Sequence, residues 1–329
     1  MRPRRKNMIY WVISTAWVLL IYLIYGQALS ALSYDLGVHL GTQLPADIIT
    51  EIGVAFFLGF AIVDAIVYIP LFLVSLVGFW AMYTWWWVLF SAALGISLYW
   101  PIACLATMTF LQNEPTWKLP NEEYRTYSVV LPCISIWATW GLWLMLAEAS
   151  SYSSSPPVTG ATAKSPNAAG LSSPWSWWVI QFPGWALLGF LIASQALTAC
   201  VSYEYGVYLG TEEPPDQVTP VGAGFLYGFT VADVMASIPL LLLGLIGHWR
   251  GEIWANVVLA ASLGILMYWA LVPWTAVVSA RDAAEWKLVH ELPYWATIGI
   301  VVPWAVTSLW LIAEPVQLNY RRGIVLKEE

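Results

Sequence analysis

The chain has 329 residues, of which 60% are hydrophobic and 10% charged, and its formal net charge is -7. Ordinary soluble domains are about 45–50% apolar and about 25% charged, so this composition excludes a water-soluble fold. The excess of acids over bases also argues against a nucleic-acid partner, because nucleic-acid binding needs a basic surface. The sequence therefore predicts an all-α, polytopic membrane protein.

Apolar runs in chain order predict the membrane spans. Runs of roughly 20 residues can cross a ~30 Å hydrocarbon layer as helices. Eight such runs lie near residues 8–32, 52–78, 85–111, 127–148, 175–200, 221–246, 254–280 and 294–314. The first follows a basic stretch like that of a signal peptide, but it is too long for a signal-peptide core, so we expect it to be retained.

The distribution of Lys and Arg predicts the orientation of the spans. With eight spans both termini lie on one side, and nine of the 13 Lys and Arg residues fall there. Cytoplasmic segments collect positive charge, so we expect both termini to be cytoplasmic. A bacterial inner membrane is the default location, although no targeting signal specifies it.

The sequence repeats itself. Residues 33–42 (SYDLGVHLGT) return as residues 202–211 (SYEYGVYLGT), and matches continue at the same spacing of 169 residues through Trp117-Lys-Leu and Trp286-Lys-Leu. Each half would be a four-helix unit, and four spans give both units the same orientation, as in a parallel repeat. The expected division is a first half over 1–149, a Ser/Pro-rich cytoplasmic linker over 150–174 and a second half over 175–329 with a short cytoplasmic tail.

One aspartate in each half is the strongest candidate for function. Asp64 and Asp233 occupy matching positions about 12 residues into a predicted span, roughly 18 Å deep and near the bilayer midplane. Such residues are costly in lipid and face a bundle interior, a partner or water. Pro70 and Pro239 follow six residues later and are expected to break the helices and free backbone carbonyls, which with the carboxylates could bind a cation or proton. The alternative is a structural one, in which each Asp hydrogen-bonds a neighbouring Tyr or Trp and fixes the packing.

Four further residues complete the predicted ion or substrate pathway. Tyr99 and Tyr268 lie in mid-span and could reach the carboxylates across the bundle. Asp35 and Glu204 lie in outer loops that lack Lys and Arg, so they could attract cations. The alternative for the loops is that they are acidic only because the basic residues stay inside.

Metal and enzyme chemistry have little support. The three histidines show no metal-binding spacing. Cys104, Cys133 and Cys200 lie in apolar runs without a C-x-x-C motif, and we expect them to be small buried hydrophobic residues. We find no nucleophile–base constellation or phosphate-binding loop, so no cofactor is assigned and an enzyme is the third choice.

Two functions of different class remain. The first is a permease or channel-like protein for a cation or small solute, with the aspartate pair at the interface between the halves. The second is a non-catalytic scaffold or accessory subunit, whose Trp-rich surface, with 23 Trp, binds lipid or another membrane protein. A shared polar cavity between the two aspartates would favour transport.

Overall fold

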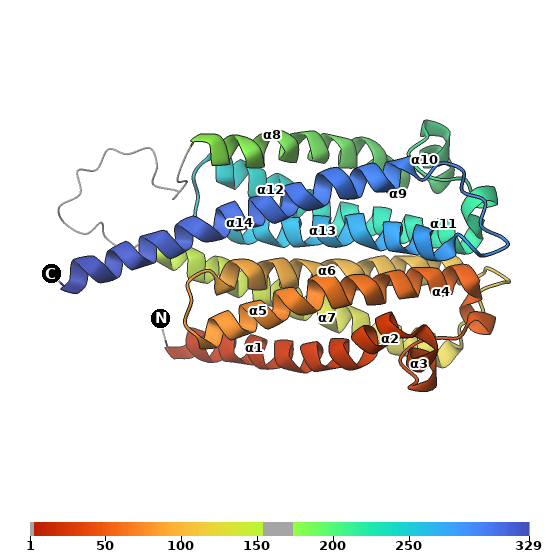
Figure 1. Cartoon of the computed structure of the whole chain (residues 1–329), viewed down its shortest axis with the longest axis horizontal. Helices are drawn as coiled ribbons and strands as arrows, with labels where there is room; N and C mark the ends of the chain where they lie inside the picture. Colours follow the sequence, from red (N-terminus) through yellow and green to blue (C-terminus); the bar gives the residue numbers. More distant parts are fainter. Residues whose placement is uncertain (1–2, 154–173, 329) are drawn as a thin grey trace.

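The computed structural model describes the backbone of residues 3–153 and 174–328, and the side chains of residues 7–150 and 175–314. Within these ranges the chain is helical and contains no strand. Among the described residues, eight helices are long and apolar enough to cross a membrane, in agreement with the predicted number of spans. They run side by side in one elongated bundle (Figure 1).

The helical elements follow one another with few connecting residues. In the first half they are α1 (Pro3–Leu23), η1 (Ile24–Ala28), α2 (Leu29–Leu32), α3 (Tyr34–His39), α4 (Ala46–Val63), η2 (Asp64–Tyr68), α5 (Ile69–Trp80), α6 (Trp86–Leu111) and α7 (Asn121–Ser153). In the second half they are α8 (Pro174–Leu191), η3 (Ile192–Ala196), α9 (Leu197–Cys200), α10 (Tyr203–Leu209), α11 (Pro215–Ala232), η4 (Asp233–Ser237), α12 (Ile238–Trp249), α13 (Ala255–Ala280) and α14 (Leu292–Glu328). The elements named η are single π-helical turns inside longer helices, so each half contributes four spans.

The two halves interlock at the centre of the bundle. Helix α4 packs on α13, α6 packs on α11, and α6 also packs on α13, so each of these contacts joins one half to the other. Helices α1 and α7 flank the first half, and α8 and α14 flank the second (Figure 1). The most apolar stretch of α13 is 94% buried and that of α6 67% buried, so α13 is the most enclosed helix.

Small residues allow the central helices to touch. A Cβ atom added at Gly95 of α6 would lie 2.1 Å from the carbonyl oxygen of Ala261 on α13. A Cβ atom added at Gly264 of α13 would lie 2.3 Å from the carbonyl oxygen of Ala92 on α6. Lipid tails are as apolar as side chains, so close van der Waals packing is what holds membrane helices together. The α6–α13 contact therefore depends on both glycines.

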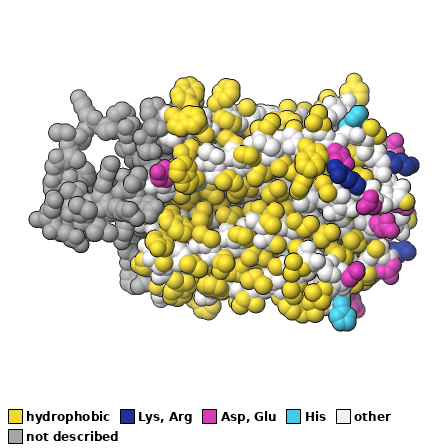
Figure 2. All heavy atoms as spheres, in the orientation of Figure 1, with side chains coloured by type: hydrophobic (Ala, Val, Ile, Leu, Met, Phe, Trp, Pro, Cys, Tyr) yellow, Lys and Arg dark blue, Asp and Glu magenta, His cyan; other side chains and the backbone are white. Residues whose placement is uncertain are grey.

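The surface is divided between an apolar flank and a charged end. Figure 2 shows hydrophobic side chains along the flank, with Asp, Glu, Lys, Arg and His gathered at the end of the bundle where α3 and α10 lie. This flank is the part of the protein that contacts the lipid bilayer.

The prediction that all three cysteines are buried was wrong. Cys104 is half-buried, whereas Cys133 and Cys200 are exposed on the flank. In a membrane protein an apolar residue can face outward, because the solvent there is lipid. Hydrophobicity alone therefore did not separate core from surface.

The start of α1, the end of α14 and the start of α8 lie at the opposite end of the bundle from α3 and α10 (Figure 1). Helix α7 continues to Ser153, so the helix takes up the first residues of the predicted linker. The remainder of the linker predicted over 150–174 lies outside the described residues, apart from Pro174, where α8 begins. Most of the basic side chains on which the predicted orientation rests also lie outside them.

Candidate functional site

Asp64 and Asp233 lie deep in the bundle. Each is close to the middle of a 35-residue span, Ala46–Trp80 and Pro215–Trp249. The exposed fraction of Asp64 is 5% and that of Asp233 is 0%. Each aspartate is the first residue of a π turn, η2 or η4. Such turns are rare inside α-helices and are frequent at functional sites.

The π turns explain how the helices pass the two prolines. The Ile69 N–H bonds to the Asp64 carbonyl, which closes the wider π turn just before Pro70. Pro70 and Pro239 then stand in the first turn of α5 and α12, where a missing N–H is tolerated. The spans therefore continue through both prolines, where the sequence predicted a break. Strongly non-helical backbone occurs instead at Thr50 and Thr219, with φ of 66° and 65°.

The two aspartates differ in their hydrogen bonding. The Tyr268 hydroxyl of α13 donates to Asp64 Oδ1 at 2.8 Å, which joins the second half to the first. In the matching place the Tyr99 hydroxyl lies beside Asp233, but it donates to the Phe229 carbonyl at 3.4 Å. Both carboxyl oxygens of Asp233 are buried without a hydrogen-bond partner, and the neighbouring Ser237 hydroxyl is also unpartnered. Of the predicted pairings of mid-span tyrosines with the aspartates, a hydrogen bond of ordinary geometry is present at Asp64, whereas at Asp233 the Tyr99 hydroxyl lies close enough to interact but is turned to the Phe229 carbonyl.

A second π turn packs against each aspartate-bearing turn. Turn η1 contacts η2 in the first half, and η3 contacts η4 in the second. In η1 the Gln27 Oε1 atom accepts a hydrogen bond of 3.3 Å from Gln43 Nε2. In η3 the Gln195 Nε2 atom donates to Glu212 Oε1, also at 3.3 Å. Sequence reasoning did not select the three glutamines, although Gln27 and Gln195 occupy matching positions in the two halves of the sequence, which was the available signal.

Glu212, in the loop before α11, lies within electrostatic reach of Asp233. Burial and, to a smaller extent, the charge of Asp233 raise the pKa of the Glu212 carboxyl to about 8, while the hydrogen bond from Gln195 opposes the shift. Burial also raises the pKa of the neighbouring Glu213, against the opposing effect of His290. Glu212 therefore interacts electrostatically with both Asp233 and Glu213.

The predicted outer residues lie at the charged end and are exposed. Asp35 is in the first turn of α3, whose N-terminus is capped by the Ser33 side chain. Glu204 is in the first turn of α10, capped in the same way by Ser202. An acid near a helix N-terminus is favourable in its own right, so their positions also suit a structural role.

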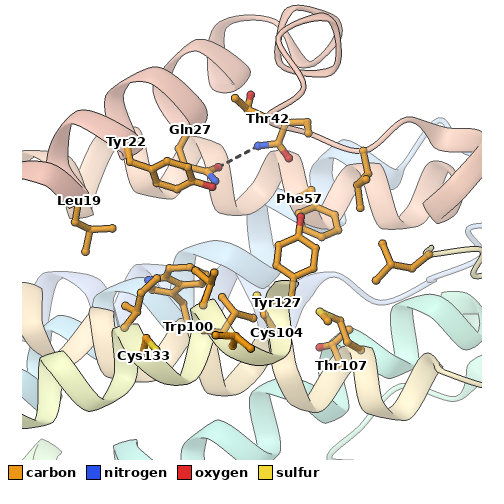
Figure 3. A pocket seen from close by; sticks show the side chains of 18 of the residues that line it. Leu19, Tyr22, Gln27, Thr42, Phe57, Trp100, Cys104, Thr107, Tyr127 and Cys133 are labelled. Carbon is orange, nitrogen blue, oxygen red and sulfur yellow. Dashed lines mark hydrogen bonds between the residues drawn. The ribbon is translucent and has the colours of Figure 1, made fainter. Parts of the chain in front are cut away.

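A cavity of about 530 Å³ lies among α1, α4, α6 and α7 of the first half, and one residue of the second half, Phe225 of α11, also lines it. Gln27 and Gln43 are part of its lining, whereas neither Asp64 nor Asp233 lines it. The close view shows Gln27, which accepts the hydrogen bond from Gln43, on one wall and Trp100, Cys104 and Cys133 on the opposite one (Figure 3). The shared polar cavity that would have united the two carboxyls is not among the described pockets.

The sequence matches no family model, and neither a curated protein nor a solved structure shows detectable similarity to it. The class is defined by the fold alone, which is that of a multi-pass helical membrane protein. Its polar centre consists of buried carboxyl and amide groups held at π turns. Among the described residues, no group of three or more His, Cys, Asp or Glu side chains is placed to hold a metal ion.

Proposed function

We propose that the protein is a permease for a cation, and that the cation is the proton. The observation that carries the proposal is Asp233, whose two carboxyl oxygens are buried in mid-span without a hydrogen-bond partner. An ionised carboxylate in such a place is very costly, so the group needs a proton or a bound cation. The neighbouring hydroxyls of Tyr99 and Ser237 are too few to replace the oxygen shell of a metal cation, and a proton needs none.

The acids between the charged end and Asp233 support a route for the proton. Glu213 and Glu212 stand toward that end, and Gln195 links Glu212 to the π turn that packs against Asp233. A carboxyl with a pKa of about 8 exchanges protons near neutral pH, which suits a relay. Asp35 and Glu204, exposed at the same end, would raise the local cation concentration.

Asp64, with its Tyr268 partner, would be the second proton-binding position. The Tyr268–Asp64 bond crosses between the halves, so release of this bond could accompany a change in their packing. Pro70 and Pro239 follow the two π turns. Because proline has no backbone N–H, each turn has one fewer backbone hydrogen bond that must break when the helix changes shape. This is the arrangement expected if the halves move relative to one another during transport.

We also infer that the halves are a tandem repeat of one four-helix unit. Each half has two π turns, beginning at Ile24 and Asp64 in one and at Ile192 and Asp233 in the other. Loop bonds match as well, with Lys118 N–H donating to the Ile48 carbonyl and Lys287 N–H to the Gln217 carbonyl, both at 2.8 Å. For orientation we propose cytoplasmic termini in a bacterial inner membrane, on the charge distribution of the sequence.

A scaffold or accessory subunit is the second candidate, and one observation favours it. Neither aspartate lines a described cavity, and α6 and α13 touch closely beside them. In that case the Tyr268–Asp64 bond locks the halves together, and the apolar flank binds lipid or another membrane protein.

Proton flux in proteoliposomes tests the proposal. Purified protein is reconstituted with an internal pH dye, and a potassium diffusion potential drives protons inward. We expect uptake with the unaltered protein, and loss of at least about tenfold in Asp233→Asn, because an amide carries no exchangeable acidic proton. Asp282→Asn, in a loop at the charged end, is the matched control and should retain the flux.

Two results would contradict the permease. The first is that vesicles containing correctly folded protein show no more proton flux than empty vesicles. The second is that an Asp64→Asn/Asp233→Asn variant shows full flux. Thermal unfolding of each variant in detergent separates loss of transport from loss of fold.

A further inference from the structure

We propose that the cavity in the first half binds a neutral, membrane-soluble molecule with a planar ring head and opposed carbonyl oxygens, of the quinone class. The proposal concerns a different surface from the aspartates and does not depend on proton transport. It rests on four properties of the cavity, which are its charge, its opening, its aromatic walls and its free hydroxyl groups.

The lining of the cavity is neutral. It contains no Asp, Glu, Lys, Arg or His side chain, and its polar members are amide, hydroxyl and thiol groups among apolar ones. A charged ligand would be left without a counter-charge in an apolar setting, at high cost. The occupant is therefore uncharged, and the volume of about 530 Å³ falls within the ~300–1,000 Å³ typical of small-molecule sites.

The cavity opens sideways, toward the lipid. Val18 of α1 and Val129 of α7 line it and are also 68% and 63% exposed. Cys133, one turn along α7 from Val129, likewise both lines the cavity and is exposed on the flank. A molecule dissolved in the bilayer could therefore enter between α1 and α7 without crossing water.

Aromatic side chains form much of the wall. They come from several helices and loops, and they are Tyr22, Phe57, Trp100, Trp117, Tyr127, Trp137 and Phe225. Flat π faces on several sides favour a flat ring, through stacked and edge-to-face contacts, over a flexible saturated chain. This is the feature that separates a ring-bearing ligand from a lipid tail.

Two hydroxyl groups in the wall are available to hold such a ring. Tyr22 stands on α1 and Tyr127 on α7, and in the part of the chain that the structure describes neither hydroxyl makes a hydrogen bond (Figure 3). The two side chains are within electrostatic reach of one another. Because each phenol can donate one hydrogen bond, the pair suits a ligand with two acceptor oxygens.

Gln27 and Gln43 add specificity at the same place. Their single mutual hydrogen bond leaves one amide nitrogen and one amide oxygen for other partners. In the second half the residue matching Gln43 is Glu212, which is acidic. We therefore assign the site to the first half alone.

Photo-crosslinking in nanodiscs tests the proposal. The full chain is placed in phosphatidylcholine nanodiscs with a short-tailed benzoquinone that carries a diazirine, and labelled peptides are identified by mass spectrometry. We expect label on the α1 and α7 segments around the cavity, and removal of this label by excess unlabelled quinone. A Tyr22→Phe/Tyr127→Phe variant should bind roughly tenfold more weakly, because it loses both donors and keeps the rings.

The control is Tyr205→Phe/Tyr208→Phe on α10, away from the cavity, which should bind the quinone as the unaltered protein does. Equal thermal stability of the two double variants would show that the first has not lost binding through misfolding. Label that excess quinone fails to displace would overturn the proposal. Displacement by a saturated alcohol of the same tail length, as effective as by the quinone, would also overturn it, because the cavity would then recognise only an apolar chain.

Discussion

The two halves of the bundle share a framework and differ at its polar centre. Both place an aspartate at the start of a π turn and a glutamine in the π turn that packs against it. In the first half the glutamine bonds to Gln43, and the flank of α6 is hollowed by a neutral cavity. In the second half it bonds to Glu212, and α13 is almost completely enclosed. The first half thus has an amide centre beside a cavity, and the second half has an acidic centre beside an enclosed helix.

The close contact common to both halves should produce the largest effect when broken. Gly95→Ala places a methyl group only 2.1 Å from the carbonyl oxygen of Ala261, and this backbone atom cannot easily move aside. We expect a loss of about 3 kcal/mol in the free energy of unfolding, at the upper end of overpacking costs. Thermal unfolding in detergent measures it.

Gly189→Ala is the control, since a Cβ atom there would meet nothing within 4 Å. Equal stability of Gly95→Ala and Gly189→Ala would contradict the packing of α6 on α13.

The aspartate–tyrosine pairs should respond unequally. Tyr268→Phe removes the hydroxyl that bonds Asp64 at 2.8 Å and leaves a buried carboxyl without that donor. We expect a loss of about 2 kcal/mol in stability, as for other buried groups left unsatisfied. Tyr99→Phe removes only a weak bond of 3.4 Å to a carbonyl and should cost about 0.5 kcal/mol.

Chemical unfolding of both variants in the same detergent makes this comparison. Equal losses would mean that Tyr99 bonds Asp233 as strongly as Tyr268 bonds Asp64, so that the two centres are alike.

Because Glu212 can ionise and Gln43 cannot, the two halves should differ in how their stability depends on pH. The pKa of Glu212 is about 8 in the fold against a usual value of 4.5, so the folded protein holds this proton more tightly than the unfolded chain. The contribution of Glu212 to the free energy of unfolding is therefore fully present below about pH 4.5. It decreases as the pH rises toward 8, by at most about 1.4 kcal/mol per pH unit.

Two substitutions, each of which installs the residue found at the matching position of the other half, measure this effect. Glu212→Gln should flatten the melting temperature between pH 5 and pH 8, and Gln43→Glu should make it steeper. A Glu212→Gln profile that runs parallel to that of the unaltered protein would show that Glu212 titrates alike in both states.

The smallest effect is expected at the exposed ion pair between Arg281 and Glu291. Arg281 lowers the pKa of the Glu291 carboxyl. Exposed pairs nevertheless contribute little to stability, and salt screens them. Arg281→Gln, which installs the residue found at the matching Gln112, should leave the melting temperature unchanged within about 1 °C. A larger drop that persists in high salt would show that this loop holds the second half together.

The sequence by itself determined the spans and the position of the aspartates. Long apolar runs fix membrane helices because the bilayer requires every backbone group to bond within its own segment. The same reasoning placed Asp64 and Asp233 in mid-span, since depth follows from counting residues along a helix. It also aligned residues 33–42 with residues 202–211, because similarity between two segments can be seen in the sequence itself.

Only the tertiary structure decided what those residues contact. The π turns at Asp64 and Asp233, the Gln27–Gln43 bond and its acidic counterpart depend on how two spans meet, which no local pattern specifies. The sequence also could not predict the exposure of Cys133 or the cavity beside it. Lipid-facing and core-facing positions are both apolar, so hydropathy does not distinguish them. In this protein the sequence set which residues enter the membrane, and packing set which of them face one another.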